Sequence, residues 1–204
     1  MAFFRTVTSS ETLPVIAGAG VTLRVPQGGD YAEWAALRES SRAFLVPWEP
    51  TWPDDDLTRG AFRRRLKRYA EDLRNDLAYA FLIFRSDDNA LVGGLTLANI
   101  RRGVAQAGSV GYWTGAPFAR KGYMTAAMRA LVPFCFGTLR LHRLEAACIP
   151  GNIASVRLLE KTGFQREGYA RSYLCINGVW QDHLLYARLQ DDVDRASPPL
   201  GCHA

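Results

Sequence analysis

The sequence predicts a single α/β domain built around a mixed sheet, and three observations lead to that prediction. Segments that alternate as β-strands are interleaved with segments of helical periodicity. The 204 residues are enough to bury one core and few for two. No internal repeat or interdomain linker divides the chain. We therefore expect an irregular N-terminal arm over residues 1–17, the domain over residues 18–189 and a flexible tail over residues 190–204.

The first third of the chain is expected to contain one short strand and two helices. Residues 21–25 alternate between apolar and polar side chains, which predicts a strand. Asp30 is suited to cap a helix over residues 30–43. Residues 45–53 hold three prolines and two tryptophans and predict a shaped loop. A second helix is expected over residues 54–73, because three aspartates open that segment and acidic side chains favour a helix N-terminus.

The middle of the chain is rich in strand patterns. Residues 78–84 and 90–100 predict two strands, and the turn-forming composition of residues 86–89 predicts a hairpin between them. The Gly-Gly pair at residues 93–94 indicates a bulge in the second strand. Residues 109–114 predict the next strand of the sheet.

A helix is expected from about Lys121, and the strand and helix that follow it complete an α/β pattern. Pro133 lacks an N–H group, so it predicts a kink or an early end of the first helix. A strand over residues 141–148 precedes Asn152, which is suited to cap the second helix. Two final strands are expected to meet at an Asn-Gly hairpin turn at residues 177–178.

Composition is ordinary for a soluble globular protein, with 48% hydrophobic and 22% charged residues. No apolar run approaches the ~20 residues of a membrane span, and the N-terminus lacks a secretory pattern. We therefore expect a cytoplasmic protein. The four cysteines form no CxxC pair and are expected to be buried, reduced thiols. With three histidines and no His/Cys cluster, no metal site is expected. The net charge of +5 mildly favours an anionic partner.

The turn between residues 109–114 and the following helix has the features of an anion site. The first N–H groups of a helix have no intrahelical partner, and they lie at the positive end of the helix dipole. Phosphate is a common ligand there. Arg120 and Lys121 add positive charge, and Gly122 allows the backbone to approach a ligand closely.

This loop and a downstream helix together resemble the two signature segments of the GNAT superfamily of acyl-CoA-dependent N-acetyltransferases. In the loop over residues 119–125, Gly122 matches the central glycine of the pyrophosphate-binding pattern, whereas Ala119 and Met124 depart from it. Residues 152–164 form the second segment, opened by Asn and closed by Gly-Phe. The order of strands and helices around these segments extends the resemblance over roughly residues 90–188.

Further segments resemble the subgroup that acetylates ribosomal-protein N-termini, the RimJ/RimL type. They are residues 47–50 (Pro-Trp-Glu-Pro), 168–173 and 177–183, and Met124 is also typical of that subgroup. The resemblance implies a GNAT-like domain with a largely antiparallel sheet of about six to seven strands flanked by helices. It also implies that a central pair of strands splays apart to form the coenzyme A cleft.

The resemblance assigns most candidate residues to binding of acetyl-CoA. Many members of the superfamily carry a Tyr that protonates the leaving thiolate, but Leu159 occupies that position here. Ser155, one turn earlier, resembles the Ser that the subgroup places near the sulfur, and it is either the acid or only a binding residue. The candidate contacts to acetyl-CoA are Tyr112, Trp113, Thr114, Arg120, Lys121, Gly122, Tyr123, Met124, Thr125, Asn152 and Ser155.

The acceptor side requires a group that removes a proton from the attacking amine. A protein α-amine has a pKa of about 7.7–8.0, against about 10.4 for lysine, so mild basic help suffices for it. Glu49 and Glu145 are the candidate bases, although Glu145 is equally expected to be a satisfied carboxylate of the sheet. Trp48, Glu49 and Asp182 are the candidate substrate-binding residues.

These observations predict an acetyltransferase that moves acetyl from acetyl-CoA to a primary amine by direct attack in a ternary complex. The expected acceptor is the N-terminal α-amine of a protein such as a ribosomal protein. Two alternatives remain open, namely a small-molecule amine acceptor and a non-catalytic coenzyme A-binding or ribosome-associated module. The basic run over residues 63–68 is a solvated helix face or a ribosome contact. No sequence-specific nucleic-acid binding is expected, and monomer and homodimer both remain open.

Overall fold

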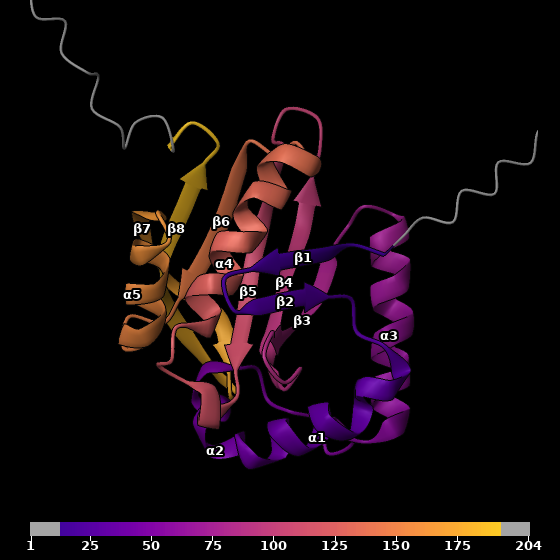
Figure 1. Cartoon of the computed structure of the whole chain (residues 1–204). Helices are drawn as coiled ribbons and strands as arrows, with labels where there is room; N and C mark the ends of the chain where they lie inside the picture. Colours follow the sequence, from indigo (N-terminus) through magenta and orange to yellow (C-terminus); the bar gives the residue numbers. More distant parts are fainter. Residues whose placement is uncertain (1–12, 193–204) are drawn as a thin grey trace, which may run out of the picture.

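Eight strands form one mixed sheet in the computed structural model, which describes residues 13–192 (Figure 1). The spatial order is β1-β2-β3-β4-β5-β6-β8-β7, and all neighbours are antiparallel except β5 and β6. The strands are β1 (Val15–Gly18), β2 (Val21–Arg24), β3 (Tyr79–Arg85), β4 (Leu91–Arg101), β5 (Ala107–Thr114), β6 (Arg143–Cys148), β7 (Gln165–Ile176) and β8 (Val179–Leu189). The helices are α1 (Tyr31–Ser40), α2 (Arg42–Leu45), α3 (Arg59–Arg74), α4 (Tyr123–Pro133) and α5 (Ile153–Lys161).

The sheet is larger than the six to seven strands expected, because β1 belongs to it. The arm predicted over residues 1–17 is therefore not irregular at its end, where residues 15–17 pair with β2. Gly20 has a φ of 73° in the tight turn that joins the two strands. Residues 1–12 of the arm and residues 193–204 of the tail lie outside the described part of the chain.

The predicted bulge is present at the start of β4. Ile83 pairs with Gly93 whereas Phe84 pairs with Leu91, so Val92 is the extra residue on the bulged strand. A side chain at position 93 would collide with the carbonyl oxygen of Trp113 on β5, which explains why glycine is required there.

The α1 helix begins directly after Asp30 as predicted but without the expected capping bond, and the start of α3 differs from the prediction. Asp30 makes no capping bond to α1, because its carboxylate accepts from Arg24 and from the Gln27 N–H instead. The α3 helix begins at Arg59, where the Thr58 hydroxyl accepts from the Ala61 N–H at 3.1 Å. The three aspartates of residues 54–56 precede α3 in a series of turns rather than opening it.

The helices cover both faces of the sheet, as the alternation along β3 shows. Phe81 and Ile83 belong to a large core that α4 and α5 share with the sheet. Leu82 and Phe84 belong to a smaller core on the opposite face, together with Trp34 of α1 and residues of α3. Each face of the central strands is therefore buried by its own pair of helices (Figure 1).

The C-terminal half largely follows the predictions. The α-helical hydrogen bonding of α4 ends at Pro133, and a single π-helical turn continues from Phe134 to Thr138. Asn177 and Gly178 have φ values of 45° and 80°, as a two-residue hairpin turn requires. Within residues 13–192, the helices lack the length and apolar composition of a membrane span.

The cysteines are only partly as predicted. Cys135 and Cys148 are buried free thiols, but Cys175 is exposed because it lies on the edge strand β7. Cys202 lies outside the described residues. Among residues 13–192, His, Cys, Asp and Glu side chains form no group that could hold a metal ion.

Candidate active site

The central strands β5 and β6 separate after a short stretch of pairing. Their parallel register holds only between residues 107–109 of β5 and residues 143–145 of β6. Beyond that point β5 pairs only with β4, and β6 pairs only with β8. The facing backbone groups at the separated ends are therefore free to bind an extended ligand between the two strands. This is the splayed pair that the family resemblance implied.

The loop that follows β5 has the backbone conformation of an anion site. Arg120 and Gly122 have positive φ values of 63° and 87°, and Gly122 is the N-cap of α4. The first helical hydrogen bond runs from the Ala126 N–H to the Gly122 carbonyl, so the preceding N–H groups are free to bind an anion. A Cβ on Gly122 would meet no atom within 4 Å, which leaves open space for a ligand there.

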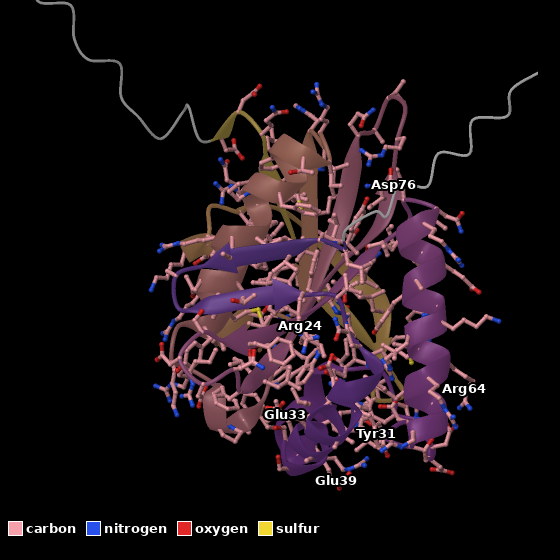
Figure 2. All side chains as sticks on the ribbon, turned by 45° about the vertical axis from the view of Figure 1, so that its right-hand side comes forward. Arg24, Tyr31, Glu33, Glu39, Arg64 and Asp76 are labelled. Carbon is pink, nitrogen blue, oxygen red and sulfur yellow. The ribbon has the colours of Figure 1, made fainter. Side chains whose placement is uncertain are left out.

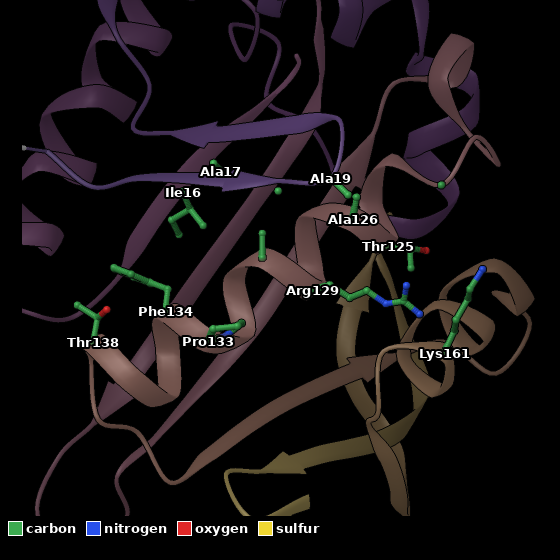
Figure 3. A pocket seen from close by; sticks show the side chains of 13 residues that line it. Ile16, Ala17, Ala19, Thr125, Ala126, Arg129, Pro133, Phe134, Thr138 and Lys161 are labelled. Atoms are coloured by element: carbon green, nitrogen blue, oxygen red, sulfur yellow. The ribbon is translucent and has the colours of Figure 1, made fainter. Parts of the chain in front are cut away.

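A groove of about 720 Å³ extends from this loop between β1, α4 and the end of α5 (Figure 3). Gly122 and Thr125 line it beside the helix start, and Arg129 and Lys161 line it further along. Neither basic side chain has an ion-pair partner among the described residues. The groove therefore offers two cations and a helix N-terminus to a phosphorylated ligand. The sequence analysis missed Arg129 and Lys161, because they share the groove only through packing of α4, α5 and the unpredicted β1.

Ser155 and Tyr112 meet across the separated strands. Their hydroxyl oxygens lie 2.6 Å apart, with Tyr112 on β5 and Ser155 in the first turn of α5. Asn152 caps α5 as predicted, because its side chain accepts from the Ser155 N–H at 3.1 Å. Burial raises the pKa of the Tyr112 hydroxyl well above its ordinary value, although the bond to Ser155 acts in the opposite direction. Tyr112 therefore remains protonated at neutral pH, and its hydroxyl can donate a hydrogen bond to the Ser155 oxygen.

Cys148 completes this cluster at the end of β6. Burial raises the pKa of its thiol, partly offset by a hydrogen bond with Ser155. Leu159, by contrast, is fully buried in the larger core and cannot contribute to proton transfer. The polar groups at the gap thus come from Ser155, Tyr112 and Cys148.

The side chains of three predicted cofactor residues, Tyr123, Met124 and Trp113, pack against other parts of the protein. Met124 is buried in the larger core, and the Tyr123 ring packs on Phe118. The Trp113 side chain packs against the smaller core on the opposite face from α4 and lines a different pocket. Lys121 is exposed at the loop. Arg120, Lys121 and Thr125 are the predicted cofactor side chains that lie nearest in sequence to the free N–H groups of α4.

This second pocket, of about 300 Å³, lies between α1, α3 and the sheet and is here called the acceptor-side pocket. Gly111, Tyr112 and Trp113 of β5 line it, so it reaches the same strand that borders the gap. Its remaining lining residues are Pro26, Trp34, Arg38, Glu49, Pro50, Phe62, Arg65, Tyr69, Ala80, Phe81, Leu82, Gly94 and Thr96.

Glu49 is fixed in the wall of the acceptor-side pocket. Both of its oxygens accept from the Arg38 guanidinium at 2.7 Å, and the Trp52 indole N–H donates to it at 2.7 Å. The Glu49 carbonyl also accepts from the Asn177 N–H at 2.9 Å, which ties the loop to the β7–β8 hairpin. Trp48 is partly exposed and is not among the residues that line this pocket.

Glu145 and Asp182 are not brought to the acceptor-side pocket. Glu145 lies where β5 and β6 are still paired, and it accepts from Arg101 and from Arg143. Glu145 is therefore a hydrogen-bonded carboxylate of the sheet, which was the alternative to its role as a base. Asp182 accepts from the Tyr169 hydroxyl and the Ser172 N–H, which lower the pKa of its carboxyl in that order.

Known proteins similar to this chain share its fold over most of its length. Residues 21–165 match the Acetyltransferase (GNAT) domain family. The probable N-acetyltransferase YjcK of Bacillus subtilis is 38% identical over 87% of this chain and 98% of its own. The [ribosomal protein uS5]-alanine N-acetyltransferase of Escherichia coli is 34% identical over 84% of this chain and 89% of its own.

Solved structures agree with these relatives. The ribosomal-protein-S5-alanine acetyltransferase of Vibrio fischeri has a TM-score of 0.81 and 31% identity, over 88% of this chain and 98% of that chain. Mycobacterium smegmatis RimJ, solved in complex with CoA-disulfide, has a TM-score of 0.82 and 29% identity, over 89% of this chain and 88% of that chain.

Proposed function

This chain belongs to the GNAT family of acetyltransferases and resembles its RimJ/RimL members, and from that premise we propose that it acetylates the N-terminal α-amine of a protein such as a ribosomal protein. It is an acetyl-CoA-dependent N-acetyltransferase. The proposal concerns the acceptor and the roles of individual residues. Two relatives whose names give an alanine of a ribosomal protein as the acceptor support it.

One observation carries the assignment of the reaction site, namely that Tyr112, the hydrogen-bond partner of the candidate acid Ser155, also lines the candidate acceptor pocket. Tyr112 lines the acceptor-side pocket and bonds Ser155 across the gap between β5 and β6. The groove with Gly122 lies beside α4 and α5. An amine in the acceptor-side pocket would approach from the opposite face of the sheet. Two substrates held on opposite faces of the gap can react directly in a ternary complex.

Residues on the cofactor side would orient acetyl-CoA, balance the charge of its phosphates and return a proton to the leaving thiolate. Acetyl-CoA brings a thioester, whose attack by an amine expels a thiolate. The free N–H groups at the start of α4, with Arg129 and Lys161, suit its phosphates. The Ser155 hydroxyl, hydrogen-bonded to protonated Tyr112, is placed to return a proton to the thiolate.

The acceptor side needs only weak basic help for an α-amine. Glu49 accepts three hydrogen bonds within its protein environment, and a carboxylate has room for about four. The one remaining site can accept from a water, and this water can take a proton from the acceptor ammonium, which the negative charge of Glu49 attracts. Glu49 is therefore proposed as a positioning carboxylate that relays a proton through water, rather than as a strong base.

The charge of α3 supports a ribosome as the partner that presents this amine. Its sixteen residues include seven basic and two acidic side chains, and Arg63 and Arg68 are exposed without an ion-pair partner among the described residues. A basic helix face suits a phosphate-rich surface. Ribosome co-sedimentation at low salt should therefore be lost when Arg63→Glu and Arg68→Glu are combined.

A substrate panel tests the proposed acceptor. Purified enzyme and acetyl-CoA are incubated with peptides that have a free small N-terminal residue, and separately with lysine, polyamines and aminoglycosides. Mass spectrometry gives the acetylated position, and kcat/KM ranks the acceptors at neutral pH. We expect the peptides to rank first. A small amine at the head of the ranking would refute the protein acceptor and leave the acetyltransferase activity intact.

A further inference from the structure

The groove between β1, α4 and the end of α5, here called the cofactor groove, contains two basic side chains without a countercharge. Arg129 of α4 and Lys161 in the last turn of α5 both line it, and neither has an ion-pair partner among residues 13–192. Glu160, the acidic neighbour of Lys161 in the sequence, instead accepts from the Tyr186 hydroxyl at 3.3 Å. Two cations that share a groove repel one another, and an anion bound to both would remove that repulsion.

These two side chains form a binding position separate from the N–H groups at the start of α4. The free N–H groups belong to the first turn after Gly122, and the effect of the helix dipole is confined to that turn. Arg129 follows Gly122 by seven residues, which corresponds to about 10 Å along the helix axis. In Figure 3 the Arg129 and Lys161 side chains extend toward the end of the groove where Thr125 lies. One ligand with two phosphate groups at different places can therefore use both positions.

Coenzyme A has phosphates at two such places. A diphosphate joins its pantetheine arm to adenosine, and a separate phosphate monoester is attached to the 3′-oxygen of the ribose. With the arm between the separated strands and the thioester at Ser155, the diphosphate would lie at the start of α4, directly after β5. The monoester carries a charge of about −1.5 to −2 at pH 7. The two positive charges of Arg129 and Lys161 match that charge.

The other walls of the cofactor groove are apolar and suit a nucleoside. Ala126 and Ala130 of α4 face Ala17 and Gly18 of β1 across it. The two elements approach closely there, because a Cβ on Gly18 would lie 3.0 Å from the Ala130 Cβ. A flat base can pack on such a surface by burial of apolar area and by dispersion. The groove thus offers an apolar surface beside its two cations.

We propose that Arg129 and Lys161 bind the 3′-phosphate of coenzyme A, and thereby select acetyl-CoA over thioesters that lack this phosphate. The inference rests on the proposed binding of acetyl-CoA in this groove, and it is independent of the acceptor. Arg129 and Lys161 act here as substrate-binding residues, and neither takes part in transfer of the acetyl group or of a proton.

Calorimetry with coenzyme A and 3′-dephospho-coenzyme A tests the proposal, because the two ligands differ only in this phosphate. For the wild type we expect coenzyme A to bind at least tenfold more tightly, as charge-assisted hydrogen bonds would give. Arg129→Met and Lys161→Met should each reduce this preference at least threefold, and the double variant should bind both ligands alike. The Kd for 3′-dephospho-coenzyme A should not change in any variant.

Ionic strength provides a second measurement on the unaltered enzyme. The preference for coenzyme A should decrease between about 0.1 M and about 1 M salt, because the screening length falls from about 10 Å to about 3 Å. A preference that came from shape alone would not depend on salt. Lys161→Arg, which keeps the positive charge, should retain more of the preference than Lys161→Met.

Arg64→Met and Lys67→Met are the matched controls, because each removes the same side chain and the same charge from a place outside the groove. Figure 2 shows Arg64 on the outer side of α3, where its side chain is 67% exposed and pairs with Asp55. Lys67 lies on the same helix with a side chain that is 80% exposed. Both controls should keep the wild-type preference for coenzyme A.

Each outcome supports or refutes one proposal. Equal affinity of the wild type for the two ligands would refute the role of Arg129 and Lys161 at the 3′-phosphate. Variant losses that are equal for both ligands would also refute it, and would assign the two side chains to the diphosphate. Losses in the control variants as large as those in the groove variants would reduce the effect to net charge and refute it too. If the preference is found but small amines are acetylated in place of peptides, the proposed acceptor fails and the 3′-phosphate site stands.

Discussion

The hydroxyl oxygens of Tyr112 and Ser155 lie 2.6 Å apart, and their hydrogen bond connects β5 to the first turn of α5. It forms beyond the point where β5 and β6 stop pairing. Ser155 is 8% exposed, so this bond is shielded from bulk water. Tyr112 also lines the acceptor-side pocket, and the first prediction concerns this pair.

Ser155→Ala should lower kcat about 100-fold, in the range of general acid catalysis, with little change in the Kd for acetyl-CoA. Tyr112→Phe should lower kcat less, because it removes the partner of the acid but keeps the ring. The double variant should be no slower than Ser155→Ala, since the two hydroxyls act as one unit. Steady-state kinetics and calorimetry separate these effects. A loss confined to acetyl-CoA affinity would make Ser155 a binding residue only.

The pH profile should have one rise and no alkaline fall up to about pH 10. The acceptor α-amine, with a pKa of about 7.7–8.0, must lose its proton, so kcat/KM should increase up to about pH 8. Tyr112 must keep its proton, and because burial raises its pKa above the ordinary value, it stays protonated throughout this range. Stopped assays between pH 6 and pH 10 test this. A fall between pH 8 and pH 10 would contradict a protonated Tyr112.

Gly122→Val should reduce acetyl-CoA affinity more than tenfold. A Cβ meets no atom there, so the cost comes from the left-handed φ of 87°, which a β-branched residue rarely adopts. The loop would change its conformation and move the N–H groups of α4. Gly122→Asn is the control, because Asn tolerates the left-handed region and should retain more of the affinity. Equal affinities in two folded variants would exclude a role of this backbone conformation in binding.

Glu49→Gln should reduce peptide kcat/KM at least tenfold and leave acetyl-CoA binding intact, because it removes the charge that holds the ammonium. It also leaves the buried Arg38 without a countercharge, which should cost about 3 kcal/mol of folding free energy. Glu39→Gln is the control, since Glu39 pairs with Arg42 on the exposed surface and should matter little. Thermal melts and kinetics on both variants give the comparison. Full peptide activity of Glu49→Gln would remove Glu49 from the acceptor site.

Alkylation at pH 8 should modify Cys175 long before Cys135 or Cys148. Cys175 is exposed on β7, whereas burial raises the pKa of Cys135 to about 12 and also raises that of Cys148. A raised pKa means less thiolate at pH 8, and the thiolate is the reactive form. Peptide mass spectrometry after timed exposure to iodoacetamide measures the order. Denaturant should make all three react alike, and early labelling of Cys135 in the native protein would contradict its burial.

The features that the sequence predicted correctly are those set by local backbone chemistry. Asn152 caps its helix, the Asn-Gly turn at residues 177–178 has positive φ values, and α4 begins at Tyr123, two residues after the predicted Lys121. Each depends on residues within a few positions of one another. The start of α3 was misplaced because the Thr58 hydroxyl caps the helix, whereas the carboxylates of Asp55 and Asp56 pair with arginines of α3.

Long-range packing accounts for what could not be predicted. The sequence did not show which group would pair with Glu145, because its partner Arg101 lies on β4, far away in the sequence. The pocket with Arg38 and Arg65 forms only after α1 and α3 pack on the same face of the sheet. Periodicity marks Arg65 as one member of a basic run and gives no sign that its Nε is buried.

The separation of β5 and β6 also divides the sheet mechanically. Three register pairs join the five-stranded part, β1 to β5, to the three-stranded part that contains β6, β8 and β7. Side-chain packing also joins the two parts of the sheet, because one continuous core includes Val110 of β5, Leu159 of α5 and Tyr186 of β8. Packing of α4, α5 and this core therefore holds the two parts together where the backbone ladder between β5 and β6 stops.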